Sequence, residues 1–349
     1  MSRAFNTVKK LSLWLLHFIF SLTVVLSTLW LCLALWIQQP LGKIVSIALI
    51  IIWLCFALSI LGIYLSRAII SKKIDVLLYV CAFAISLAWY FNIEAHQDRI
   101  WNPEVAKMLH YERQGDLITL HNVRNFDWRS ETEYSERWES RRFNLKDVRS
   151  ANIITSYWMG PQIAHTLVSF DIQGQAPLTF SIEIRKEKTE NFSAIGGFFR
   201  KFELSLVAAD EKDIVYTRSH IRGEQVYFFP VNMQPALVQK LLLEYLQTAD
   251  ELAAQPKWYN TLTSNCTTLV FDMIQAVTQQ ALPSDYRLLA SGYLPNYLYD
   301  LKALPRSEWN MQTWYEQAHV NPKLAASTPL TSQEYSQLIR LKRLENLNK

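Results

Sequence analysis

The chain has 349 residues, of which 50% are hydrophobic and 19% are charged, and its formal net charge is +4. The hydrophobic content is too high for an ordinary soluble protein and the charged content is too high for a bundle buried wholly in lipid, so the chain should divide into a membrane part and a water-exposed part. Lys/Arg and Asp/Glu are interspersed and no phosphate-binding or dinucleotide fingerprint is present, so neither a nucleic-acid surface nor a nucleotide site is expected.

Three apolar runs precede residue 92, at residues 11–37, 44–65 and roughly 74–91. Each is close to the roughly 20 residues that a helix needs to cross a hydrocarbon core. The first run is longer than the apolar part of a signal peptide, and no small-residue cleavage site follows it. Residues 1–91 are therefore predicted to be a retained membrane anchor of three transmembrane helices.

Basic residues predict the orientation of this anchor. Arg3, Lys9 and Lys10 precede the first span, and Arg67, Lys72 and Lys73 lie between the second and the third, whereas only Lys43 lies between the first and the second. Since short cytoplasmic segments are enriched in Lys and Arg, the N-terminus should be cytoplasmic. Three crossings then place the rest of the chain outside the bacterial inner membrane, in the periplasm.

The part after residue 91 alternates between strand and helix patterns. Residues 92–141 are polar and aromatic and are predicted to be a wrapping segment with short strands. Residues 142–310 are predicted to be the catalytic domain, and 311–349 a C-terminal helical tail with its last helix from about Thr331. Helices are expected from Pro235 and from Cys266. Period-two or β-branched runs predict strands at 151–157, 165–172, 178–185, 204–209 and 226–229, which makes the fold class α+β.

Cys266 is the one cysteine outside the apolar runs. Asn265 precedes it, and the apolar period of a helix follows, so the thiol should lie at a helix N-terminus. Unpaired N–H groups and the helix dipole there stabilise a thiolate, the form in which cysteine acts as a nucleophile. A buried structural cysteine in the first turn of a core helix is the alternative.

Of the histidines after residue 91, only His165 begins a predicted strand. If residues 173–175 form the loop of a hairpin, the register places Glu183 directly across from His165, where a carboxylate can hold the imidazole tautomer. A slip of one residue would turn Glu183 to the other face, as a solvated partner of Arg185 or Lys186. Ser169 or Asp171 would then be the candidate for the third position.

Three segments resemble the periplasmic domain of the Lnb-type lipoprotein N-acyltransferases, over roughly residues 127–304. They are the run from Gly160 to Phe170 with its Ala-His-Thr box, the run from Ser181 to Glu187, and the run from Tyr259 to Thr268 with its Asn-Cys-Thr-Thr box. The order of His strand, polar strand and Cys helix is also similar to a circularly permuted papain-like fold, as in the lecithin-retinol acyltransferase relatives and NlpC-type enzymes.

This resemblance implies a cysteine enzyme with Cys266 as nucleophile, His165 as base and Glu183 as the third group. It also implies oxyanion or substrate contacts from Tyr259, Asn260 or Asn265, together with backbone N–H groups at Cys266. Neither a metal nor another cofactor is expected. The three spans do not match the membrane arrangement of the characterised acyltransferases, which leaves the substrate open.

The function expected from these features is acyl transfer from a phospholipid to the terminal amine of a lipoprotein through a Cys266 thioester. A thiol hydrolase acting on lipid esters or on peptidoglycan peptides is the second hypothesis, because it needs only water as the acceptor. The third is a membrane-anchored, non-catalytic binding module in which Cys266 belongs to the core.

Overall fold

The computed structural model describes residues 2–66, 72–279, 281–283, 285–324 and 330–345, with side chains from residue 11 to residue 340. The chain divides into two compact units. The first comprises Met1–Ala95 and Ser193–Lys201, and the second comprises His96–Phe192 and Phe202–Lys349.

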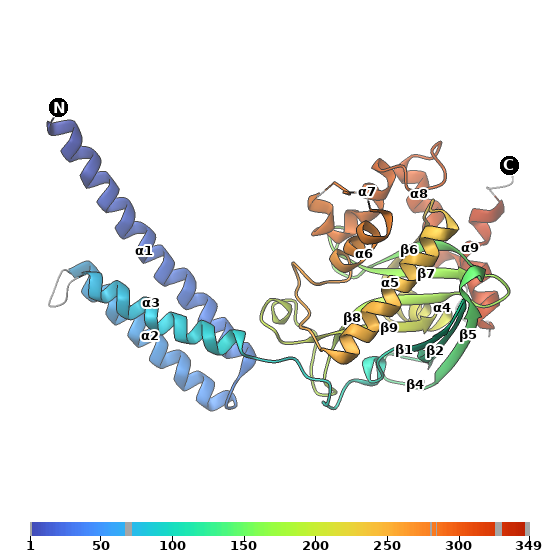
Figure 1. Ribbon diagram of the computed structural model, residues 1–349, viewed down its shortest axis with the longest axis horizontal. Coiled ribbons are helices and arrows are strands. Elements are labelled where there is room, and N and C mark those ends of the chain that lie inside the picture. Colours follow the sequence, from blue (N-terminus) through green and yellow to red (C-terminus); the bar gives the residue numbers. More distant parts are fainter. Residues whose placement is uncertain (1, 67–71, 280, 284, 325–329, 346–349) are drawn as a thin grey trace. The chain divides into compact units, whose positions relative to one another are not determined.

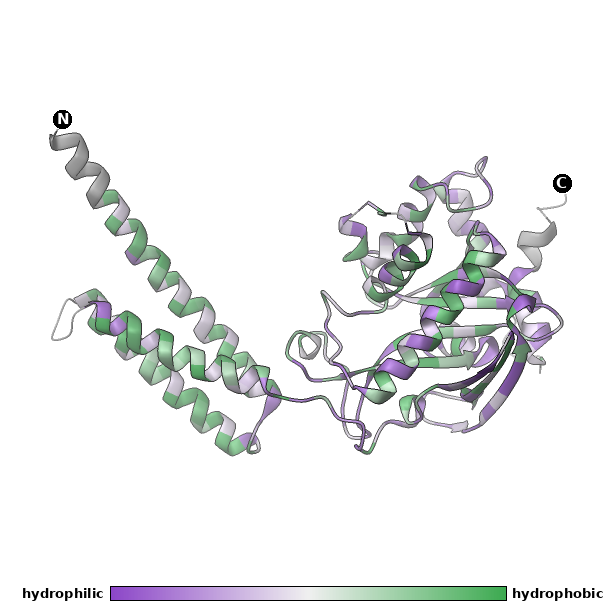
Figure 2. Ribbon diagram, in the orientation of Figure 1, coloured by the Kyte–Doolittle hydropathy of each residue, from purple (hydrophilic) through white to green (hydrophobic). Residues whose placement is uncertain are grey.

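Three helices form most of the first unit, namely α1 (Ser2–Gln38), α2 (Lys43–Ser66) and α3 (Lys72–Phe91). All three are long and apolar enough to cross a membrane, which confirms the three predicted spans. In Figure 2 the described parts of these helices are coloured mainly as hydrophobic residues. Trp53 and Tyr79 pack in the core that the three helices share. Arg67, used above for orientation, lies outside the described residues, as do the side chains of Arg3, Lys9 and Lys10.

The second unit is built on an eight-stranded sheet in the order β1-β2-β9-β8-β7-β6-β10, with β5 paired to β2. All its pairs are antiparallel except β2 with β9. The strands are β1 (His110–Gln114), β2 (Leu117–Arg124), β5 (Trp138–Asn144), β6 (Val148–Tyr157), β7 (Ala164–Ile172), β8 (Leu178–Arg185), β9 (Glu203–Asp210) and β10 (Gln225–Pro230), and β3 (Asp127–Trp128) pairs with β4 (Tyr134–Ser135).

Helix α5 (Pro235–Ala254) lies across one face of the sheet (Figure 1). Its apolar side, with Leu241 and Tyr245, shares a core with Phe170, Phe180 and α6 (Thr268–Thr278). A second core, containing Leu167 and Val207, lies against α4 (Glu211–Tyr216) and α9 (Ser332–Glu345). The remaining helices are α7 (Leu294–Asp300) and α8 (Met311–Ala318).

The five strands predicted between residues 151 and 229 are all present, as are the helices at Pro235 and near residue 331, so the mixed α+β class is confirmed. Two features differ from expectation. Strands β1 and β2 and most of β5 come from residues 92–141 and belong to the main sheet, because Ile118, Leu120 and Val123 are buried in its core. Helix α4 and the π-helical turn that continues it, Thr217–Ile221, were not predicted.

Candidate active site

Cys266 lies in the turn that leads into α6, two residues before the first helical residue, Thr268. The Asn265 carboxamide oxygen accepts hydrogen bonds from the N–H groups of Thr267 (2.8 Å) and Thr268 (2.9 Å). In return the Asn265 N–H donates to the Thr268 hydroxyl at 3.0 Å. This reciprocal arrangement is a helix cap, and it fixes the thiol close to the positive end of the helix dipole, as the sequence predicted within two residues.

The hairpin of β7 and β8 has the predicted register. Leu167 pairs with Ser181, and Ser169 pairs with Thr179. Continued by two residues, this register sets His165 across from Glu183. The His165 Nε2 atom is 3.2 Å from the Glu183 carboxylate and 2.7 Å from the Ser181 hydroxyl, which itself donates to Glu183 at 2.7 Å.

The start of β7 meets the start of α6. The Cys266 thiol and the His165 imidazole form a side-chain hydrogen bond, and the backbone of Thr166 also hydrogen-bonds to the sulfur. Beside them, the hydroxyls of Thr166 and Thr267 are 3.0 Å apart. Cys266 and His165, separated by about a hundred residues of chain, are therefore direct partners in the fold.

The charges around this pair favour proton transfer from sulfur to imidazole. Burial disfavours the thiolate, but the charge and the hydrogen bond of His165 outweigh burial, so the pKa of Cys266 lies below its ordinary value. Burial and the positive charge of Arg218 oppose the imidazolium, yet Glu183 and Cys266 raise the pKa of His165 to about 9. At neutral pH these shifts favour a thiolate beside an imidazolium, as in activated cysteine nucleophiles.

Arg218 is a member of the cluster that the sequence did not suggest. Its guanidinium is 2.7 Å from Glu183 and 3.4 Å from Glu224, and its side chain is largely buried. Although burial disfavours the charged form of Glu183, His165 and Arg218 hold the pKa of this carboxyl well below its usual range. Arg218 lies in the π-helical turn after α4, in a polar stretch without a periodic pattern, so no sequence signal singled it out.

The three residues expected at the oxyanion or substrate differ in what they contact. Burial raises the pKa of Tyr259, and the charges of Cys266 and Glu183 raise it further, so its ring belongs to the site. The Asn260 side chain accepts from the N–H groups of Leu262 (2.9 Å) and Thr263 (3.1 Å). Asn265 caps α6, and its NH₂ group donates to the Thr261 carbonyl at 2.7 Å. Both asparagines thus shape the loop before Cys266.

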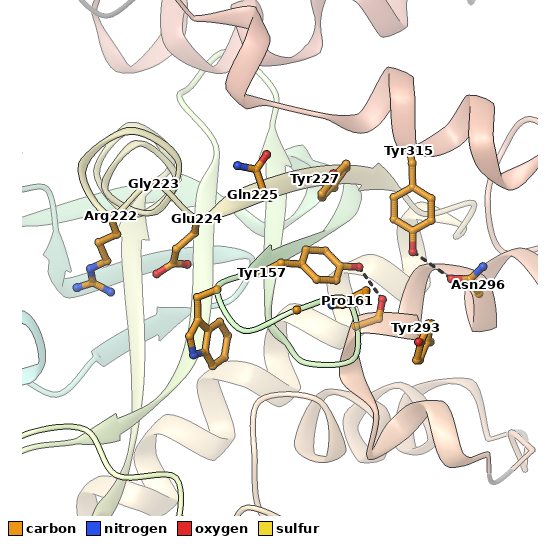
Figure 3. Close-up of a pocket in the computed structure, with 13 residues that line it drawn as sticks. Tyr157, Pro161, Arg222, Gly223, Glu224, Gln225, Tyr227, Tyr293, Asn296 and Tyr315 are labelled. Atoms are coloured by element: carbon orange, nitrogen blue, oxygen red, sulfur yellow. Dashed lines mark hydrogen bonds between the residues drawn. The ribbon is translucent and has the colours of Figure 1, made fainter.

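A pocket of about 690 Å³ opens beside the charged cluster (Figure 3). Glu224 lines it and also accepts from the Ser156 hydroxyl, next to the Arg218 contact described above. The Tyr157 hydroxyl donates to the Gly292 carbonyl at 2.6 Å, and Tyr315 contacts the Asn296 side chain at 3.0 Å. Five of the residues that line it are aromatic, namely Tyr157, Trp158, Tyr227, Tyr293 and Tyr315. Its volume is typical of small-molecule sites.

No group of three His, Cys, Asp or Glu side chains that could hold a metal ion occurs among the residues that the structure describes. The side chains of the cluster offer a thiol that loses its proton readily, an imidazole that can accept and return that proton, and a carboxylate held ionised beside the imidazole.

Comparison with known families identifies the segment that contains this cluster. Residues 134–292 match the family model of the Lnb N-terminal periplasmic domain, the family that the Ala-His-Thr and Asn-Cys-Thr-Thr boxes resemble. This match and the three long apolar helices support a membrane protein with a periplasmic domain. No curated protein and no solved structure matches the chain.

Proposed function

We propose that this protein is a membrane-anchored periplasmic cysteine acyltransferase that moves an acyl chain from a phospholipid to the amino-terminal amine of a lipoprotein. The observation that carries the proposal is the hydrogen-bonded pair of Cys266 and His165 backed by Glu183. The Lnb family match supports a role in lipoprotein processing at the membrane. The permuted papain-like relationship is part of the same proposal, supported by the order of the His strand β7, the Glu strand β8 and the Cys helix α6.

In the first half-reaction the Cys266 thiolate attacks the carbonyl carbon of a phospholipid ester. A tetrahedral oxyanion forms and collapses, the carbon–oxygen bond breaks, and His165 gives its proton to the departing oxygen. The products are a thioester on Cys266 and a lysophospholipid. Glu183 stabilises the imidazolium before the proton leaves, and Arg218 keeps Glu183 ionised in its buried position.

In the second half-reaction the neutral amine of the acceptor attacks the thioester carbonyl. His165, now neutral, takes a proton from the attacking nitrogen, the carbon–sulfur bond breaks, and the thiolate is restored as an amide forms. Anchoring suits this reaction, because donor and acceptor are both held in the membrane, which concentrates them near the site.

For the oxyanion we assign the backbone N–H of Cys266 and the Tyr259 hydroxyl, with Asn260 and Asn265 positioning the loop that presents them. Replacing Tyr259 by Phe should slow thioester formation by roughly 100-fold, the loss typical of one oxyanion donor. Tyr245→Phe is the matched control, since the Tyr245 ring is buried in the core against which Tyr259 packs and its hydroxyl has no hydrogen-bond partner among the described residues. A loss in the control but not in Tyr259→Phe would move the assignment to Tyr245.

The decisive experiment traps the intermediate. The full-length protein in phospholipid nanodiscs is quenched in acid, and its intact mass is measured before and after hydroxylamine. We expect one added acyl chain on Cys266 that hydroxylamine removes and that a synthetic diacylated lipopeptide accepts on nitrogen. Release of free fatty acid with no transfer would indicate the hydrolase, and cleavage of peptidoglycan peptides with no acyl-enzyme would indicate a cell-wall substrate. A Cys266 that resists thiolate-directed reagents at neutral pH would leave only the binding module.

The orientation of the anchor is part of the proposal, with a cytoplasmic N-terminus and the catalytic part, residues 142–310, in the periplasm. A reporter that is active only outside the cytoplasm should work when fused after Asn92 and fail when fused between the second and third spans. The reverse result would contradict the periplasmic location and the lipoprotein substrate with it.

A further inference from the structure

Part of the connection between β8 and β9 packs with the three apolar helices, although both flanking strands belong to the sheet. Ser193–Lys201 is part of the same compact unit as α1, α2 and α3. The side chain of Gln38, the last residue of α1, donates to the carbonyls of Phe199 and Arg200. This segment is thus fixed to the end of a membrane-spanning helix by its backbone.

Arg200 ties the same segment to the end of α3. Its guanidinium donates to the carbonyls of Tyr90 (3.2 Å), Phe91 (3.0 Å) and Ile93 (3.1 Å) and lies 5.1 Å from the centre of the Tyr90 ring. A cation at this position satisfies carbonyls that a helix end leaves without partners and balances the negative end of the helix dipole. This contact holds the segment beside the C-terminal end of α3.

Aromatic rings gather at this end of α3, as is typical where the hydrocarbon of a membrane ends. Phe199 is buried with Ala34 and Tyr90, and the Trp30 ring centre lies 4.8 Å from that of Tyr90 and 6.2 Å from that of Phe199. Helix α3 has 20 residues, which at 1.5 Å per residue is about the thickness of a hydrocarbon core. Trp and Tyr gather where the hydrocarbon meets the headgroups.

Two other large apolar side chains of the segment are exposed. Ile195 and Phe198 are 56% and 39% exposed. Such a group costs free energy in water but not at a lipid boundary, where apolar side chains enter the acyl region and basic ones remain among the headgroups. We propose that residues 193–199 insert into the lipid surface at the end of α3 and form a second membrane attachment of the sheet-bearing unit, in addition to the linker after the third span.

This attachment acts on the strand that carries part of the active site. The connection begins immediately after β8, and β8 contributes Ser181 and Glu183 to the cluster around His165. A loop that rests in lipid would therefore hold this end of the sheet near the leaflet that contains a phospholipid donor. This consequence rests on the proposed function, whereas the insertion itself does not.

Insertion is tested by photo-crosslinking. A benzophenone amino acid replaces Ile195 in the full-length protein, in nanodiscs of phosphatidylethanolamine and phosphatidylglycerol. Leu58, 67% exposed on α2, is the lipid-facing reference, and Leu289, 55% exposed in the second unit, is the control. We expect phospholipid adducts at Ile195 as frequent as at Leu58 and on the order of tenfold above Leu289. A yield at Ile195 equal to that at Leu289 would overturn the proposal.

The consequence for catalysis is tested with the double variant Ile195→Glu and Phe198→Glu, with Leu289→Glu as control. Thioester formation from bilayer phospholipid should fall about tenfold in the double variant, because charges at these positions oppose insertion. Hydrolysis of a water-soluble short-chain ester should be unchanged. Loss of both activities would show that the loop acts through the fold and would overturn the role in lipid delivery. A wild-type protein inactive on both substrates would remove the proposed function, and the crosslinking would still decide the insertion.

Discussion

Strand β7 has a cluster of charged side chains at each end of one face. At its start, His165 contacts Glu183, which is held by Arg218. At its end, Asp171 contacts Arg340 at 2.9 Å. Near the same end, the Ser169 hydroxyl donates to Glu211 at 2.6 Å, and Arg340 is 2.7 Å from that carboxylate.

The two clusters differ in what can ionise. The cluster at Arg340 joins two carboxylates to one guanidinium. Burial disfavours the charged guanidinium, but Glu211 and Asp171 together raise the pKa of Arg340 above its ordinary value. It fastens α9 to the sheet. The cluster at His165 contains a thiol and an imidazole that share a proton, and a pocket shares Glu224 with it. Buried ion pairs alone are therefore no mark of an active site, whereas a nucleophile with a shifted pKa is.

The largest expected effect comes from removing the proposed nucleophile. Cys266→Ser should lower acyl-enzyme formation at least about 1,000-fold, because a hydroxyl is far less ionised than a thiol at this position. Its folded structure and unfolding midpoint should stay close to those of wild type, since the two side chains differ little in volume. Cys55→Ser, in the second span, is the matched control and should keep full activity. If turnover were undiminished in Cys266→Ser, the cluster at His165 would have only a structural role, like the cluster at Arg340.

The next largest effect is expected on the free energy of unfolding, with no effect on the reactivity of Cys266. Arg340→Met leaves Glu211 buried without its guanidinium, and breaking a buried pair in this way costs about 3 to 5 kcal/mol of unfolding free energy. Denaturant unfolding of the full-length protein in detergent measures the loss. Arg129→Met removes an exposed ion pair with Glu133 and should cost no more than about 1 kcal/mol. Labelling of Cys266 below the transition should be unchanged in Arg340→Met. Slower labelling would show that the two ends of β7 are coupled.

Glu183→Gln should slow the reaction by a partial factor, on the order of 100-fold, because it keeps the shape of the side chain and removes the charge that favours the imidazolium. Glu183 helps raise the pKa of His165 to about 9 against the opposing charge of Arg218, so the loss of Glu183 lowers that pKa. The alkaline limb of the pH profile of acyl-enzyme formation reports loss of the imidazolium and should move to lower pH.

Asp171→Asn is the matched control at the other end of the strand. It should leave the alkaline limb in place and reduce stability, since Asp171 contacts Arg340. If the limb moved in Asp171→Asn and not in Glu183→Gln, the third position would belong to Asp171.

The sequence predicted those features of the site that depend on patterns among neighbouring residues. A strand has a period of two and the β7–β8 loop is short, so the assignment of residues 173–175 to the loop set the register that places His165 across from Glu183. The helix start at Cys266 followed from Asn265 and the apolar period of α6 in the same way.

The contacts that were missed join distant parts of the chain. Arg218 reaches Glu183 across 35 residues from an irregular π-helical turn, and Arg340 reaches Glu211 across 129. An isolated Arg belongs to no periodic pattern in the sequence. Its ion-pair partner depends on how the strands and helices pack in the folded sheet. Similarly, the polar residues of 92–141 concealed the short apolar alternation of β2, whose Ile118 and Leu120 enter the core.

The smallest effect is expected from Ser181, whose hydroxyl lies between His165 and Glu183 at 2.7 Å from each. It accepts from the imidazole N–H and donates to the carboxylate, while His165 and Glu183 also contact one another at 3.2 Å. Ser181→Ala removes the bridge and leaves that direct contact. A hydrogen bond of this kind is worth about 0.5 to 1.5 kcal/mol, so acyl-enzyme formation should slow by roughly two- to tenfold.

Two further measurements separate this positioning role from a structural one. The alkaline limb should move in the same direction as in Glu183→Gln but by less, and Ser181→Thr, which keeps the hydroxyl, should restore it. Thr179→Val is the matched control, because Thr179 is buried two residues away on the same face of β8 and its hydroxyl has no hydrogen-bond partner among the described residues. It should change neither rate nor pH profile. A loss in Ser181→Ala as large as in Glu183→Gln would mean that the carboxylate acts on His165 through the serine and not directly.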